Sequence, residues 1–159
     1  MRIGTMGETI LIVDDDDVLG QILSRVLAQQ GFTVRRAITA AQALQVGTQW
    51  PPRLALLDLC LPDGDGVELA RQLQAANGDL VLLLMTAYPL RLRDDSAGAA
   101  LFERVLTKPL NLQELRQAAA AALGGTCCVP APARVAEPVS TGHSLSQREP
   151  AASGSKLSD

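Results

Sequence analysis

The sequence lacks the features of a disulfide-stabilised, secreted or membrane-spanning protein. It has three cysteines, Cys60, Cys127 and Cys128, and an odd number with two adjacent residues is not the pattern of a disulfide framework. No apolar run approaches the roughly 18 residues of a membrane span, and the first residues lack the apolar core of a secretion signal. We therefore expect a cytoplasmic protein with no membrane partner.

Aromatic residues and excess basic charge are also scarce. Only Phe32, Trp50, Tyr88 and Phe102 are aromatic, so the core must consist mainly of Leu, Ile, Val and Ala. The formal net charge is −3, which gives no general attraction for nucleic acid. With 159 residues and 47% hydrophobic content, the chain has enough material for one ordinary domain.

The composition changes near Gly124, and this change divides the chain. Residues 124–159 are rich in Pro, Ala and Ser and have neither helical nor strand periodicity, which predicts a flexible tail. Within it, Cys127, Cys128 and His143 have no partner motif. The tail is also too short for a helix-turn-helix, so we expect it to contain no output domain. The folded domain is expected to span residues 8–123.

Within residues 8–123, short β-type runs alternate with helical patterns. The predicted strands are 9–13, 32–36, 53–58, 80–85 and 104–107, and the predicted helices are 18–30, 39–50, 65–78 and 111–125. A weaker helical pattern, which contains Gly98, covers residues 90–100. This alternation predicts an α/β fold, a five-stranded parallel sheet with helices on both faces. Thr39 and Asn111 are expected to cap the helices that they precede.

Polar, reactive residues follow four of the five predicted strands. Asp14 and Asp15 follow the first, Asp58 ends the third, Thr86 follows the fourth and Lys108 follows the fifth. Because sites in open parallel sheets form at the carboxyl ends of strands, we expect these side chains to meet at one edge. Three gathered carboxylates need a cation, and hard oxygen ligands suit Mg²⁺ or Mn²⁺.

An aspartate beside a divalent cation is suited to phosphoryl transfer. Asp58 would attack phosphorus as a covalent nucleophile, while Lys108 and the Thr86 hydroxyl would contact other phosphoryl oxygens. Asp16 and Asp17 have a simpler interpretation, as residues that begin the following helix and complement its dipole. The LPDGDG segment is interpreted as a turn, because its register does not fit a calcium loop.

The motifs ILIVDDD, LALLDLCLPDGDG, LMTAY and LTKPL, in this order and at strand ends, resemble those of the receiver domain of bacterial two-component response regulators. The resemblance covers roughly residues 8–123. It implies a flavodoxin-like fold with strand order 2-1-3-4-5 and a phosphorelay function. Histidine kinases or phosphotransfer proteins would be the upstream partners, and a further protein the downstream one.

The resemblance also implies roles for single residues. Asp58 corresponds to the phosphoryl acceptor, Asp14 and Asp15 to the acidic metal-binding pair, and the backbone carbonyl of Cys60 to a third protein ligand of the metal. Thr86 corresponds to the switch hydroxyl and Lys108 to the phosphate-pairing lysine. Pro109 corresponds to a proline that commonly follows a cis bond. The chemistry would be limited to autophosphorylation and autodephosphorylation, as in a signalling protein rather than a metabolic enzyme.

Two departures from the family pattern affect the expected output. Val105 stands where receivers usually have Tyr or Phe, and Leu101 and Phe102 replace a pair of small residues. The usual aromatic route of signal transmission would therefore be missing or altered. We expect Phe102 to be a core residue rather than a replacement switch. The alternatives are a phosphorylation-independent interaction module, a truncated DNA-binding regulator and, less favoured, an aspartyl phosphohydrolase.

Overall fold

The structure is a computed structural model, and it describes residues 8–124. Its five principal strands form one parallel sheet in the order β2-β1-β3-β6-β7. They are β1 (Thr9–Val13), β2 (Thr33–Ala37), β3 (Leu54–Asp58), β6 (Val81–Thr86) and β7 (Arg104–Thr107). Since β4 and β5 are two-residue strands of a separate hairpin, the predicted order 2-1-3-4-5 is confirmed.

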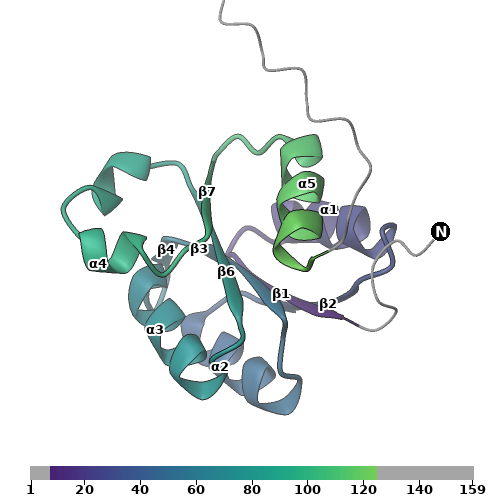
Figure 1. The fold of residues 1–159 in the computed structure, drawn as a ribbon, viewed down its shortest axis with the longest axis horizontal. Helices are drawn as coiled ribbons and strands as arrows, with labels where there is room; N and C mark the ends of the chain where they lie inside the picture. The colour runs from purple at the N-terminus through teal and green to yellow at the C-terminus, as the bar shows by residue number, and fades with distance from the viewer. Residues whose placement is uncertain (1–7, 125–159) are drawn as a thin grey trace, which may run out of the picture. The chain divides into compact units, whose positions relative to one another are not determined.

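Helices cover both faces of this sheet, as Figure 1 shows: α1 and α5 lie on one side, and α2 and α3 on the other. The helices are α1 (Asp17–Ala28), α2 (Ala40–Gln49), α3 (Gly66–Ala76), α4 (Ser96–Ala99) and α5 (Leu112–Ala122), with a 3₁₀ helix η1 (Pro89–Leu92). No helix among the described residues is long and apolar enough to cross a membrane.

Two hydrophobic cores result from the alternation of side chains along the strands. On β1, Ile10 and Ile12 pack with residues of α1 and α5, whereas Leu11 and Val13 pack with residues of α2 and α3. Both faces of the central strands are therefore buried, which explains why their sequences are nearly continuous apolar runs. Phe102 is buried in the second of these cores, as expected.

Polar side chains begin the helices where the sequence predicts caps. Thr39 accepts a hydrogen bond from the backbone N–H of Gln42 at the start of α2. Asn111 accepts from Gln113 and Glu114 at the start of α5. Each bond satisfies an N–H that has no partner inside the helix, so these residues fix where the helices begin.

The helix expected over residues 90–100 is the main correction to the predicted fold. The segment instead forms η1 and the single turn α4. Pro89 lies in the first turn of η1, and Asp95 begins a new turn by accepting a hydrogen bond from the N–H of Gly98. A Cβ atom at Gly98 would lie 2.7 Å from the Val67 side chain, so the glycine permits close packing against α3.

The residues between β3 and α3 form a β4–β5 hairpin, Cys60–Leu61 with Gly64–Asp65, where the sequence predicts a turn. Gly66 then donates its N–H to the Leu59 carbonyl, 2.9 Å away, and begins α3 directly over the Asp58 backbone. A Cβ atom at Gly66 would overlap the Asp58 carbonyl oxygen. Glycine is therefore required here by close backbone approach.

We predict that Gly66→Ala lowers the free energy of unfolding by about 3 kcal/mol, because the added methyl must displace main-chain atoms. The matched control is Gly64→Ala, whose Cβ would have the Ala40 Cβ, 4.0 Å away, as its nearest neighbour. The control should change stability by less than about 0.5 kcal/mol. Urea unfolding followed by circular dichroism measures both, and equal stability of the two variants would contradict the proposed backbone contact.

Candidate functional site

An acidic cluster occupies the carboxyl edge of the sheet, as the sequence predicts. Asp14, Asp15 and Asp58 each place a carboxylate oxygen within 4.8 Å of the others. Asp14 and Asp58 are only 2% and 8% exposed, whereas Asp15 faces solvent. Parallel pairing of β1 with β3 brings the three acids together, since Asp14 directly follows β1 and Asp58 ends β3. No second group of this kind occurs within residues 8–124.

Lys108 supplies the positive charge of this cluster. Its Nζ lies 2.8 Å from Asp14 Oδ2 and 3.0 Å from Asp58 Oδ2, so one ammonium pairs with both buried carboxylates. Burial acts to lower the pKa of Lys108, but the hydrogen bonds and negative charges of Asp14 and Asp58 outweigh it and raise that pKa above 10.5. The lysine is therefore a stable cation at neutral pH.

The donor set fits a divalent cation. Three carboxylates carry three negative charges and Lys108 offsets one of them, which leaves a formal charge of −2 in a partly buried space. Carboxylate oxygens are hard ligands of the kind that Mg²⁺ takes, in company with water and phosphate oxygens. One exposed ligand, Asp15, leaves the cluster accessible from solvent.

Backbone contacts hold Asp14 in place. The N–H of Asp14 donates to the Ala37 carbonyl, 3.1 Å away, at the end of β2. Asp14 Oδ1 accepts from the N–H of Asp16, 2.9 Å away, and Asp16 in turn caps α1 by accepting from Leu19. Asp16 is thus a helix-start residue, as expected, and it also orients Asp14.

Thr86 lies buried at the end of β6. Its Oγ1 accepts a hydrogen bond from the Tyr88 N–H, 2.9 Å away, within a turn of two residues. The hydroxyl keeps its own proton for donation to another acceptor. Thr86 is opposite Thr107 in the β6–β7 register, so its strand end lies beside the one that precedes Lys108.

The position of Cys60 connects Asp58 with the β4–β5 hairpin. The Cys60 N–H donates to Asp58 Oδ1 at 3.3 Å, and its thiol is free and exposed.

Two further features lie on and after β7. The Lys108–Pro109 peptide bond is cis. Val105, at the altered switch position, is 38% exposed on the edge strand β7.

Asp63 anchors this hairpin in a way that the sequence analysis did not foresee. Its two carboxylate oxygens accept from the N–H groups of Ala40 and Ala41, at 2.7 and 2.9 Å, at the start of α2. These two backbone hydrogen bonds lower the pKa of Asp63 below its ordinary value. The bonds join residues more than 20 positions apart, so local pattern gives no sign of them.

Arg36 and Arg91 are two further residues that the sequence analysis missed. Arg36 forms an ion pair with Asp17, and its hydrogen bond is the main reason why the pKa of Asp17 lies below its ordinary value. A Cβ atom at Gly20 would lie 2.8 Å from the Arg36 guanidinium, so the glycine gives it space. Arg91 donates to the Cys60 sulfur at 3.4 Å.

Some predicted features lie outside the described residues. These are Cys127, Cys128 and His143, together with almost all of the predicted tail of residues 124–159. They remain predictions from the sequence.

Comparison with known proteins shows which family and which proteins this chain is similar to. The sequence model of the response regulator receiver domain matches residues 10–120. Sporulation initiation phosphotransferase F of Bacillus subtilis is 32% identical over 114 residues, which cover 71% of this chain and 91% of that protein. Response regulator MprA of Mycobacterium ulcerans is 36% identical over 113 residues, which cover 69% of this chain. The chain spans about half of MprA, 47% of its length.

Solved structures agree with these sequence matches. Response regulator TrrA of Thermotoga maritima, in complex with Mg(2+)-BeF, aligns with a TM-score of 0.67 and 26% identity, over 73% of this chain and 99% of that one. A signal receiver domain from Pseudomonas fluorescens aligns with a TM-score of 0.69 and 30% identity, over 78% of this chain and 92% of that one.

We predict that Lys108→Met lowers the free energy of unfolding by about 2 kcal/mol at neutral pH without divalent cations, because two buried carboxylates lose their partner. Arg116→Met is the control, since Arg116 is exposed and forms no ion pair within residues 8–124. The raised pKa of Lys108 sets the pH dependence. From neutral pH up to pH 10.5 the stability difference from wild type should be constant, and it should shrink as the ammonium deprotonates at higher pH. Denaturant unfolding across this range measures it, and a difference that grows above pH 10.5 would contradict the pairing.

Proposed function

The chain belongs to the family of response regulator receiver domains, and on this premise we propose that Asp58 accepts the phosphoryl group by which it signals. A receiver domain is a phosphorylation-dependent switch of two-component signalling, and this chain is such a switch. The observation that carries the assignment to Asp58 is the placement of its carboxylate against Lys108 and within reach of Asp14 and Asp15.

The proposed transfer needs few groups. A carboxylate oxygen of Asp58 forms a bond to phosphorus while the bond between phosphorus and the donor's phosphohistidine nitrogen breaks, and the electron pair leaves with nitrogen. Lys108 pairs with the negative charge of the transferred group. The buried Thr86 hydroxyl donates to a phosphoryl oxygen. Autophosphorylation from small donors and slow autodephosphorylation would use the same groups.

Asp14, Asp15, Asp58 and the backbone carbonyl of Cys60 would hold the magnesium ion. When bound, the ion supplies positive charge against the transferred phosphoryl group. This proposal is limited to magnesium, which is the ion named for the TrrA complex. It is supported by the formal charge of −2 that remains in the cluster after Lys108 is counted.

The proposed consequence of phosphorylation is a change in partner binding. The added phosphate brings about two negative charges and strong acceptors, which draw Thr86 and Lys108 towards Asp58. This shifts the population of surfaces near β6 and β7. The upstream partner would be a histidine kinase or a phosphotransfer protein, and the downstream partner another protein. The proposed setting of this exchange is the cytoplasm.

The alternatives have less support. A phosphorylation-independent module would have no need to gather three carboxylates around one lysine, yet Asp14, Asp15 and Asp58 are gathered there. A DNA-binding regulator is kept as a second candidate only for a longer form of the protein, because the chain spans about half of MprA. An aspartyl phosphohydrolase needs a second acid two residues after the nucleophile, where this chain has Cys60.

We predict that Mg²⁺ binds to the acidic cluster and raises the thermal unfolding temperature of the wild-type protein, by binding the folded state. Asp15→Asn should weaken Mg²⁺ binding roughly tenfold, since it removes one charged ligand that is exposed and not needed for folding. Asp16→Asn is the control, because asparagine keeps the α1 cap and Asp16 lies outside the cluster. Equal weakening in both variants would argue against a cluster-specific site.

We predict that incubation with acetyl phosphate and Mg²⁺ adds one phosphoryl group to the wild-type protein and none to Asp58→Asn. The amide of asparagine cannot act as the nucleophile, although it keeps the shape of the carboxylate. Intact-protein mass spectrometry measures the product, and hydroxylamine should remove it, as expected of an acyl phosphate. Asp16→Asn should be phosphorylated like wild type. Retention of the added mass in Asp58→Asn would place the acceptor elsewhere.

A further inference from the structure

Arg91 is a cation near the acceptor site that has no strong partner. It lies in η1, and its Nη1 donates to the Cys60 sulfur at 3.4 Å. Its guanidinium carbon is also 5.7 Å from the centre of the Tyr88 ring. In the part of the chain that the structure describes, Arg91 forms no ion pair with a carboxylate. A thiol is a weak acceptor, so this contact uses little of the guanidinium's capacity.

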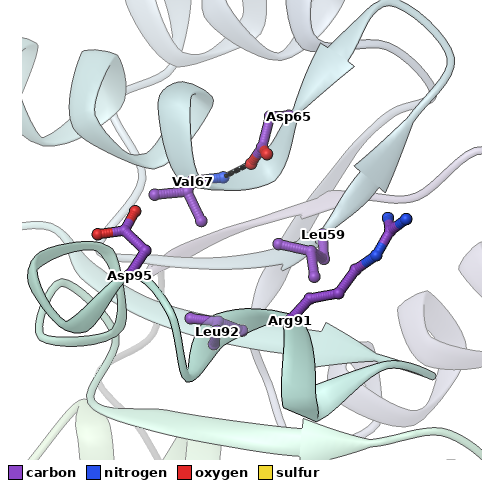
Figure 2. Close-up of a pocket in the computed structure, with 6 residues that line it drawn as sticks. All are labelled: Leu59, Asp65, Val67, Arg91, Leu92 and Asp95. Atoms are coloured by element: carbon purple, nitrogen blue, oxygen red, sulfur yellow. Dashed lines mark hydrogen bonds between the residues drawn. The ribbon is translucent and has the colours of Figure 1, made fainter.

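The two acids that line a pocket with Arg91 already have other partners. Arg91, Asp65 and Asp95 line one pocket of about 320 Å³, together with Leu59, Val67 and Leu92. Asp65 accepts from the N–H of Val67, and Asp95 pairs with Arg71 and accepts from the N–H of Gly98. Figure 2 shows that the Arg91 side chain extends past Leu59 and away from Asp95. Its charge is therefore directed out of the pocket.

The thiol that Arg91 contacts belongs to the residue whose backbone touches Asp58. The Cys60 N–H donates to Asp58 Oδ1 at 3.3 Å. Cys60 thus contacts the Arg91 guanidinium through its thiol and the Asp58 carboxylate through its N–H. The long arginine side chain can reposition its guanidinium by rotation about its side-chain bonds.

We propose that Arg91 binds the phosphoryl group on Asp58. Its guanidinium would give up the hydrogen bond to the Cys60 sulfur and donate to a phosphoryl oxygen instead. The inference rests on the proposed function and adds a residue to it. A phosphoryl group offers three strong acceptor oxygens, and the planar guanidinium pairs with them through two parallel hydrogen bonds. No covalent step involves Arg91; it exchanges a weak acceptor for a strong one.

This exchange would couple phosphorylation to η1. Thr86 is linked to the same segment, because its hydroxyl accepts from the N–H of Tyr88, the residue that precedes η1. Rotation of that hydroxyl towards a phosphoryl group would break this bond, and Arg91 would pull the segment from its other end. The pocket that Arg91 and Leu92 line gives η1 space to move. The route does not use an aromatic residue at position 105.

The test is binding of beryllofluoride, which mimics a phosphoryl group, in the presence of saturating Mg²⁺. Arg91→Gln should weaken beryllofluoride binding roughly tenfold, and Arg91→Lys should lie between it and wild type, because lysine keeps the charge but not the planar fork. Arg93→Gln is the matched control, an exposed arginine from the end of η1 that forms no ion pair within residues 8–124. It should bind beryllofluoride as wild type does. Amide NMR should also show beryllofluoride-dependent shifts at residues 88–92 that are reduced in Arg91→Gln.

Three kinds of outcome overturn the proposal, and they can be told apart. If wild type does not bind beryllofluoride with Mg²⁺, the proposed function fails and this inference fails with it. If wild type binds and Arg91→Gln binds equally well, or if Arg93→Gln loses as much, the role of Arg91 alone is wrong. Binding of Mg²⁺ without beryllofluoride serves as the folding control. Arg91→Gln should bind Mg²⁺ no more weakly than wild type, and a loss there would show a merely structural role.

Discussion

The rest of this structure depends on the contact of the Lys108 ammonium with the two buried carboxylates of Asp14 and Asp58. Asp14 and Asp58 come from neighbouring strands, and without Lys108 they would present two like charges to each other in a nearly solvent-free space. The lysine follows β7, at the far edge of the sheet from β2, so the contact also fixes how that edge strand ends relative to the centre. Because one cation cannot offset three acids, the site stays receptive to further positive charge. Stability and chemistry thus depend on the same atoms.

The two loops beside Asp58 are held with unequal firmness, and this difference matters for a switch. The loop from β3 to α3 is held by Gly66 against the Asp58 backbone and by the two bonds from Asp63 to α2. The segment from β6 to β7 contains only a 3₁₀ helix and a single α-helical turn, and most of its backbone hydrogen bonds join residues three or four positions apart. Structure of this kind opens at low free-energy cost. The proposed acceptor, Asp58, therefore lies beside the more firmly held of the two segments.

Sequence pattern was sufficient for the features that depend on local chemistry. The strands, the caps at Thr39 and Asn111, and the gathering of Asp14, Asp15 and Asp58 all follow from periodicity and from where parallel strands end. It failed for contacts between distant segments. The bonds of Asp63 to α2 and the pairing of Arg36 with Asp17 depend on how separate elements meet in space. The helix over residues 90–100 was wrong for a related reason, since the close approach of Gly98 to Val67 and the cap at Asp95 favour a break that apolar spacing does not reveal.

Val105 determines which kind of output this domain can use. An aromatic switch works by moving a large side chain between exposed and buried positions, and valine has neither the size nor the rotamer freedom to do so. Phe102 cannot replace it, because it is already packed in the core on the α3 side of the sheet. What remains near Thr86 is the backbone of residues 88–92, joined to the site at one end by the Thr86 hydroxyl and at the other by Arg91. With Arg91 in the role that we propose for it, a receiver of this composition would transmit its signal by rearranging main chain, and a partner would recognise the surface of η1 and α4.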